Sequence, residues 1–140
     1  MKKLLSTLYI ALFLITNSCS VISGVQNATY DPITISIGAT DAKSMDSFYV
    51  AMEGNPQNYV FWQSKYQVQE ANIAALIFKE TTRPNAATQL KLAVAIQDNF
   101  KSLEIKHSEY ITLNAAQLQA NQRIMQAYWK AWLKGELSTQ

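Results

Sequence analysis

The stretch YVFWQSKYQVQEANIAALIFKE, residues 59–80, decides the fold class. Its large apolar side chains recur every three or four residues, which is the spacing of one face of an α-helix. This stripe consists of Tyr59, Trp62, Tyr66, Ile73 and Ile77, and it is broadened by Val60, Ala71, Ala74, Ala75 and Phe78. We predict a helix from Pro56 to Glu80 with Asn55 as its cap, and its breadth of apolar surface indicates a central position in the domain.

The flanking segments have the same periodicity. Before the break at Gly54, a helix from a cap at Thr40 or Asp41 to Glu53 is predicted by Met45, Phe48 and Met52. After the break at Pro84, a third helix capped by Asn85 is predicted by Leu90, Val94, Ile96, Phe100 and Leu103, with Ala86 and Ala93 allowing close approach. A fourth helix from Ser108 to Lys134 is predicted by Tyr110, Leu113, Gln117, Ala120, Ile124, Ala127 and Ala131. The sequence therefore predicts an all-α protein, an antiparallel bundle of about four helices.

One short segment departs from this pattern. In ITISIG, residues 33–38, three isoleucines alternate with Thr34 and Ser36. A period of two is typical of a strand, so we predict a short extended arm before the bundle. Such an arm could lie across the helices or pair with another protein.

The N-terminus has the features of an export signal. Lys2 and Lys3 precede residues 4–15, which carry no charge. This segment is shorter than the roughly 20 apolar residues that a membrane-spanning helix needs, but it suits the core of a signal peptide. The following ITNSC, residues 15–19, resembles the lipobox of bacterial lipoproteins, because the small Ser18 precedes the cysteine; Thr16 departs from the usual leucine.

That resemblance implies how the chain is processed and anchored. Residues 1–18 would be removed as a signal peptide, and Cys19 would receive the lipid that anchors the chain to a membrane. Residues 19–32 would then be a tether for a domain of residues 33–140, and Ser20 resembles the signal for outer-membrane delivery. Two alternatives remain open: cleavage after Ser20, which would give a soluble periplasmic or secreted protein, and a free cysteine without a role.

The charge and the cysteine content argue against a nucleic-acid-binding protein and against a disulfide-stabilised fold. Once Lys2 and Lys3 are removed with the signal, basic and acidic residues balance at 10 each, and no basic stripe of a nucleic-acid-binding protein is present. Because Cys19 is the single cysteine, an intramolecular disulfide is excluded.

The sequence predicts no catalytic residue, no metal site and no cofactor. Glu104 and His107 form one Glu-x-x-His motif, but a di-iron bundle needs this motif twice and the chain has a single histidine. A haem held by His107 with Met45 or Met52 is conceivable, although methionines at helical spacing more often fill cores. No GxSxG elbow or phosphate-binding loop accompanies His107, so a hydrolase is the least favoured hypothesis.

Aromatic residues give a stronger indication of function than the candidate catalytic residues do. They cluster in two stretches, and the candidate partner-binding residues are Tyr59, Phe61, Trp62, Tyr128, Trp129 and Trp132. Neighbouring positions spread around a helix, so some of these rings are expected to be exposed and to anchor a protein interface; alternatively, the N-terminal arm covers them.

The C-terminal region adds a second resemblance. Residues 113–133, LNAAQLQANQRIMQAYWKAWL, resemble in composition the helical minor-pilus and entry-exclusion proteins of conjugative type IV secretion systems. This likeness implies a non-enzymatic lipoprotein that acts as a protein-binding accessory of an envelope or secretion assembly. The alternative is a periplasmic immunity or inhibitor protein that blocks a toxin or hydrolase. Neither the partner's identity nor the oligomeric state follows from the sequence.

Overall fold

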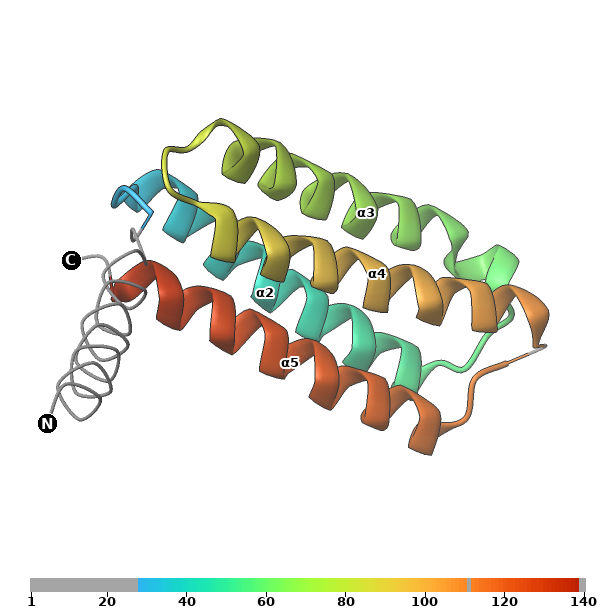
Figure 1. The fold of residues 1–140 in the computed structure, drawn as a ribbon. Helices are drawn as coiled ribbons and strands as arrows, with labels where there is room; N and C mark the ends of the chain where they lie inside the picture. The colour runs from blue at the N-terminus through green and yellow to red at the C-terminus, as the bar shows by residue number, and fades with distance from the viewer. Residues whose placement is uncertain (1–27, 111, 139–140) are drawn as a thin grey trace, which may run out of the picture.

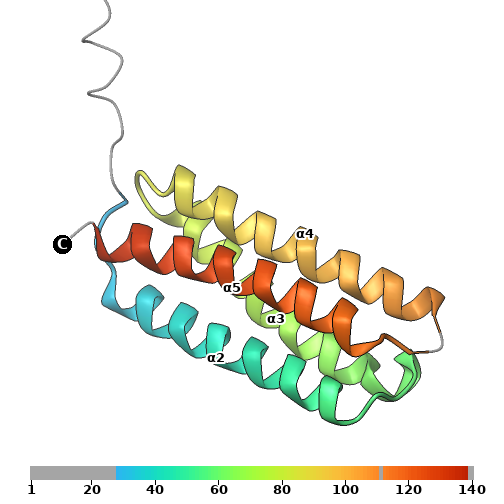
Figure 2. The same cartoon turned by 90° about the horizontal axis from the view of Figure 1, so that it is seen from below.

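The computed structural model describes residues 28–110 and 112–138, which form four α-helices. Their bounds are Pro32–Gly54 for α2, Tyr59–Thr82 for α3, Ala87–Glu109 for α4 and Ala115–Leu137 for α5. Consecutive helices run antiparallel, and α2 and α4 each pack against both α3 and α5 (Figure 1). The helices α3 and α5 therefore occupy opposite corners of the bundle, as the view from below also shows (Figure 2). The predicted antiparallel four-helix bundle is confirmed.

The buried side of each helix follows alternating steps of three and four residues. The positions are Thr34, Gly38, Asp41, Met45, Phe48 and Met52 in α2, Trp62, Tyr66, Gln69, Ile73, Leu76 and Glu80 in α3, Gln89, Ala93, Ile96, Phe100, Leu103 and His107 in α4, and Leu118, Met125, Trp129, Trp132 and Glu136 in α5. Two departures occur: Tyr49, next to Phe48, is buried as well, and Leu118 is followed by Met125 after a full heptad. This is the a and d spacing of a heptad, which lets antiparallel helices interlock along their whole length. We use a and d for these core positions and b, c and f for the positions that point outward.

Aromatic rings fill the middle of the core. Phe48 of α2 makes edge-to-face contacts with Trp62, Tyr66 and Phe100, with ring centroids 5.7, 5.0 and 5.5 Å apart. Such pairs add roughly 0.5–1.5 kcal/mol each beyond the burial of their area. Because these rings come from α2, α3 and α4, the cluster fixes the mutual register of three helices.

The segment 33–38 is helical, so the predicted extended arm is wrong. The helix α2 begins at Pro32, where the missing N–H leaves no hydrogen bond unmade, and Asp31 caps it by accepting from the Ile33 N–H at 3.0 Å. The cap at Asp31 and the proline at the first helical position favour a helix more strongly than the alternating isoleucines favour a strand. No strand occurs in residues 28–110 or 112–138. The predicted cap at Thr40 or Asp41 is wrong as well, because Asp41 lies buried in the middle of α2.

Three other predicted helix starts shift along the chain. The cap of α3 is Asn58, not Asn55, and its side chain accepts from the Phe61 N–H at 3.1 Å. The cap of α5 is Asn114, not Ser108, because Asn114 and Gln117 form a reciprocal capping box. The cap of α4 is Ala86, not Asn85. Asn85 precedes it and has a left-handed backbone conformation with φ 61°.

Two predicted buried faces are also corrected. In α5 the predicted stripe, with Gln117, Ala120 and Ile124 among its members, is exposed except for Leu113, while the larger side chains of the parallel stripe from Leu118 to Trp132 are buried. In α3 the stripe of Trp62, Tyr66 and Ile73 is buried as predicted, but the residues expected to broaden it are exposed: Val60, Ala71, Ala74, Ala75 and Phe78. Consequently α3 is not surrounded by the other helices as predicted, and its outer side is apolar and exposed to solvent.

None of α2 to α5 combines the length and the apolar character that crossing a lipid bilayer requires.

Candidate protein-binding surfaces

The predicted partner-binding aromatics divide between core and surface. Trp62, Trp129 and Trp132 are at most 3% exposed, so these three candidate residues lie in the core. Tyr59 and Tyr128 are half-buried, whereas Phe61 is 50% exposed. The heptad explains this division, because Trp62, Trp129 and Trp132 occupy a or d positions and Phe61 occupies c.

A groove of about 470 Å³ runs between α2 and α5. Its floor is apolar and comprises Ala39, Ala42, Met45, Met125, Trp129 and Leu133. Asp46 lies on one edge, where its Oδ1 accepts hydrogen bonds from Gln122 at 3.1 Å and from Gln126 at 2.9 Å. Lys43 and Lys130 complete the rim, and neither forms an ion pair within the part of the chain that the structure describes. The groove thus combines an apolar floor with a rim that holds the Asp46 carboxylate and two lysines without ion pairs among the described residues.

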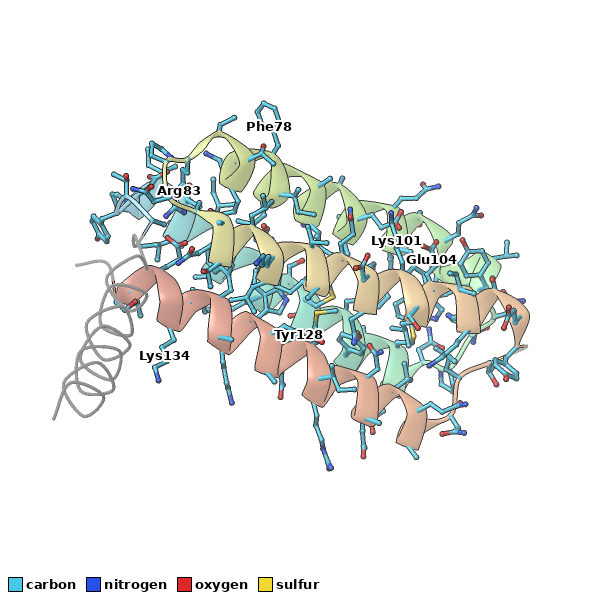
Figure 3. All side chains as sticks on the ribbon, in the orientation of Figure 1. Phe78, Arg83, Lys101, Glu104, Tyr128 and Lys134 are labelled. Atoms are coloured by element: carbon cyan, nitrogen blue, oxygen red, sulfur yellow. The ribbon has the colours of Figure 1, made fainter. Side chains whose placement is uncertain are left out.

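The outward side of α5 continues this positive character. Its exposed charged residues are Arg123, Lys130 and Lys134, all basic, and Lys134 projects away from the bundle in Figure 3. The carboxylate of this helix, Glu136, is buried. A partner with acidic side chains would therefore be attracted to the side of the bundle that carries the groove.

His107 lies buried at the end of the bundle where α2 joins α3. Its Nε2 lies 3.0 Å from the carbonyl oxygen of Gln57 and its Nδ1 lies 3.1 Å from the hydroxyl of Tyr66. Since a carbonyl can only accept, Nε2 carries the proton and Nδ1 accepts from Tyr66. Burial lowers the pKa of His107, which favours this neutral form.

The neighbouring Glu104 is also engaged, because its carboxylate accepts from the Tyr59 hydroxyl at 2.7 Å. Both groups of the Glu-x-x-His motif therefore have protein partners. Within residues 28–110 and 112–138, no group of three or more His, Cys, Asp or Glu could hold a metal ion.

The opposite end holds a buried ionic cluster centred on Arg83. Its guanidinium donates to both oxygens of Glu80 at 3.1 Å, to Glu136 at 3.0 and 2.9 Å, and to the carbonyl of Thr29 at 3.0 Å. Burial and the Glu136 carboxylate raise the pKa of Glu80 to about 7, against the opposing effect of Arg83. This cluster joins α3, α5 and the segment before α2.

The first described residues belong to this arrangement and not to a free tether. Ala28 is buried, and the Thr29 N–H donates to the Pro84 carbonyl at 3.3 Å. The predicted tether of residues 19–32 is therefore wrong for its last part, since Pro32 already lies in α2. Cys19 and the rest of the predicted signal and tether lie outside the described residues.

Sequence reasoning missed both the groove and the ionic cluster. The groove arises only when α2 and α5 pack side by side, so no short stretch of sequence predicts it. The cluster had a weak signal, because Glu80 continues the a and d spacing of α3 and Arg83 follows it by three residues. Comparison with protein-family models, with curated proteins and with solved structures finds no match to this chain.

Proposed function

We propose that this chain is a non-enzymatic lipoprotein of the cell envelope that binds another protein in the groove between α2 and α5. The observation that supports this best is the pairing of an apolar floor with the unpaired rim cations Lys43 and Lys130. The occupant would be an amphipathic helix of a partner, with apolar side chains facing the floor and acidic side chains facing the two lysines.

Two features of the sequence support a location in the envelope. The resemblance of residues 15–19 to a lipobox supports a lipid at Cys19, which would hold the domain at a membrane surface. The segment 113–133 that resembles proteins of conjugative secretion systems contains most of α5 and therefore one wall of the groove. Together they favour an accessory role in an envelope or secretion assembly.

A charge-reversal experiment tests the binding surface. The full chain carrying Lys43→Glu and Lys130→Glu is expected to recover partner from detergent-solubilised envelope at least about tenfold less well than the wild type, because two attractions become repulsions. The matched control carries Lys91→Glu and Lys101→Glu, two exposed lysines of α4. Both variants should retain the helical circular dichroism of the wild type, since all four positions are exposed.

The outcome separates the proposal from its rivals. Equal recovery by both variants and the wild type would contradict binding in the groove. A one-to-one complex with a toxin or hydrolase, together with loss of that enzyme's activity, would support the inhibitor hypothesis instead.

A further inference from the structure

The outward side of α3 carries no charge along its whole length. Its b, c and f positions are all exposed: Val60, Phe61, Ser64, Gln67, Val68, Ala71, Ala74, Ala75, Phe78, Thr81 and Thr82. The solvent-facing side of a helix in a soluble bundle is normally rich in charge, because charged side chains interact well with water. An uncharged side of 24 residues, about 36 Å long, is therefore a feature that solvation alone does not explain.

The other three helices of the bundle differ from α3 in this respect. Their outward positions include Lys43, Asp46 and Glu53 in α2, Lys91, Asp98, Lys101 and Glu109 in α4, and Arg123, Lys130 and Lys134 in α5. The lack of charge is thus specific to one helix and is not a general consequence of composition.

Large apolar side chains stand near both ends of this side and, at Val68, near its middle. Val60 and Phe61 are 75% and 50% exposed, and Val68 and Phe78 are 56% and 69% exposed. Phe78 points away from all the other helices in Figure 3. Between Val68 and Phe78 the side is lined by alanines, with Ala71 near the middle of the helix, so another helix could approach closely there.

We infer that two copies of this chain associate through α3, antiparallel and related by a twofold axis at Ala71. Such an axis places residues whose numbers sum to 142 at the same level of the two helices. Ala71 then meets Ala71 of the second copy, Phe78 lies over Ser64, Phe61 lies beside Thr81 and Val68 beside Ala74. One symmetry operation thus sets Phe61, Val68 and Phe78 each against a smaller side chain, which is what an isologous interface requires.

A parallel, in-register pairing fits less well. It would set Phe78 against Phe78 and Phe61 against Phe61, while Ala71 and Ala75 would face each other across a gap. Gaps forfeit the dispersion contacts that hold an interface together. The alternation of large and small residues therefore favours the antiparallel arrangement.

The charges of α3 are compatible with this contact. Lys65, Glu70 and Lys79 occupy e and g positions, which point sideways, so none of them is buried between the two helices. Lys65 extends over the rings of its own helix, with its Nζ 4.2 Å from the centroid of Trp62. In the antiparallel pair, Lys65 and Lys79 of the two copies fall on the same side of the contact. Added salt should therefore strengthen the association by screening this repulsion.

The contact between two single helices is small. Interfaces below about 1,200 Å² belong to weak or transient complexes, so we expect a dissociation constant in the micromolar range. Because α3 and α5 occupy opposite corners, the dimer would leave both α2–α5 grooves open and would present two binding surfaces. The inference goes beyond the proposed function and stands without it.

Single cysteines placed in the full chain, with Cys19→Ser in every variant, test this geometry. Ala71→Cys should form a disulfide-linked dimer under mild oxidation, because residue 71 meets its copy on the axis. Ser64→Cys, on the same side of the same helix, should not, because the two residues 64 would lie about 21 Å apart along the helices. Ala127→Cys, on the exposed side of α5, should not cross-link either. Dimers at residue 64 as abundant as at residue 71, or no dimer at residue 71, would overturn the inference.

Sedimentation equilibrium gives an independent readout in the same Cys19→Ser background. Phe78→Glu should weaken dimer formation at least about tenfold, since it brings a charge into the contact. Ile105→Glu is the matched control, because Ile105 is a 57% exposed apolar residue at an f position of α4 and should leave the mass distribution unchanged. Any association through the apolar residues 4–15 would be the same in both variants. A mass that is monomeric up to high micromolar concentration, or an equal effect of the two substitutions, would contradict the dimer.

Discussion

Gly38→Ala is expected to destabilise the bundle by about 3 kcal/mol, although alanine favours a helix interior over glycine by roughly 0.5–1 kcal/mol. The reason is the fully buried ring of Trp132, which lies directly on Gly38. A Cβ added there would overlap Cζ3 and Cη2 of the indole and would lie 3.2 Å from Cε3. The ring is rigid and enclosed by the core, so either the ring or α2 must move. Urea unfolding followed by circular dichroism measures the loss.

Two further variants make this result diagnostic. Gly54→Ala, at the end of the same helix with nothing within 4 Å of the added Cβ, should leave stability unchanged or slightly raised. Trp132→Leu combined with Gly38→Ala should be destabilised by less than the sum of the two single substitutions, because the smaller side chain makes room for the methyl group. Equal stability of Gly38→Ala and Gly54→Ala would show that α2 and α5 do not meet as described.

Arg83→Met should destabilise the protein by about 3–5 kcal/mol at pH 8, since it removes the cation that balances two buried carboxylates. Glu80 and Glu136 have fully buried side chains, and both accept from Arg83. In the wild type, burial already raises the pKa of Glu80 to about 7 from an ordinary value of 4.5. Its contribution to stability is therefore largest below pH 4.5 and falls as the pH rises towards 7.

The same linkage predicts the pH dependence of the Arg83→Met effect. Without the guanidinium the pKa of Glu80 rises further, so the variant continues to lose stability above pH 7, where the wild type no longer does. At pH 5 the Glu80 carboxyl is protonated at little cost, and the destabilisation should be less than about half of that at pH 8. Arg123→Met, at an exposed position of α5, serves as the control and should have a small effect at both pH values. Identical destabilisation by Arg83→Met at pH 5 and pH 8 would contradict this account of the cluster.

The fold followed from the sequence because large apolar residues mark the core of each helix. Phe48, Trp62, Ile96 and Phe100 were assigned to buried faces from spacing alone, and all are at most 5% exposed. The fourth helix shows where spacing fails: two stripes with steps of three and four coexist in α5, and spacing does not say which is buried. The volume of Trp129 and Trp132 decides it, since only the interior of the bundle can remove such large surfaces from water.

A hydrophobic pattern cannot predict which polar residues are buried in the core. Glu80 and His107 continue the a and d spacing, but a carboxyl or imidazole belongs in a core only when partners from other helices meet it. Those partners are Tyr66 of α3 for His107 and, for the pair of Glu80 and Arg83, Glu136 of α5; they are known only once the helices are placed. The apolar breadth of α3 is visible in the sequence, but spacing alone does not distinguish a buried helix from one with an uncharged outer side.

The proposed location and partner class both depend on export of the chain with a lipid at Cys19. The most direct test is the intact mass of the protein extracted from the membrane fraction of cells that export it, with Cys19→Ala as the control. The account predicts a chain that begins at Cys19 and carries covalently bound acyl chains. A chain that retains residues 1–18 with an unmodified Cys19, or one that begins at Val21 in the soluble fraction, would contradict it.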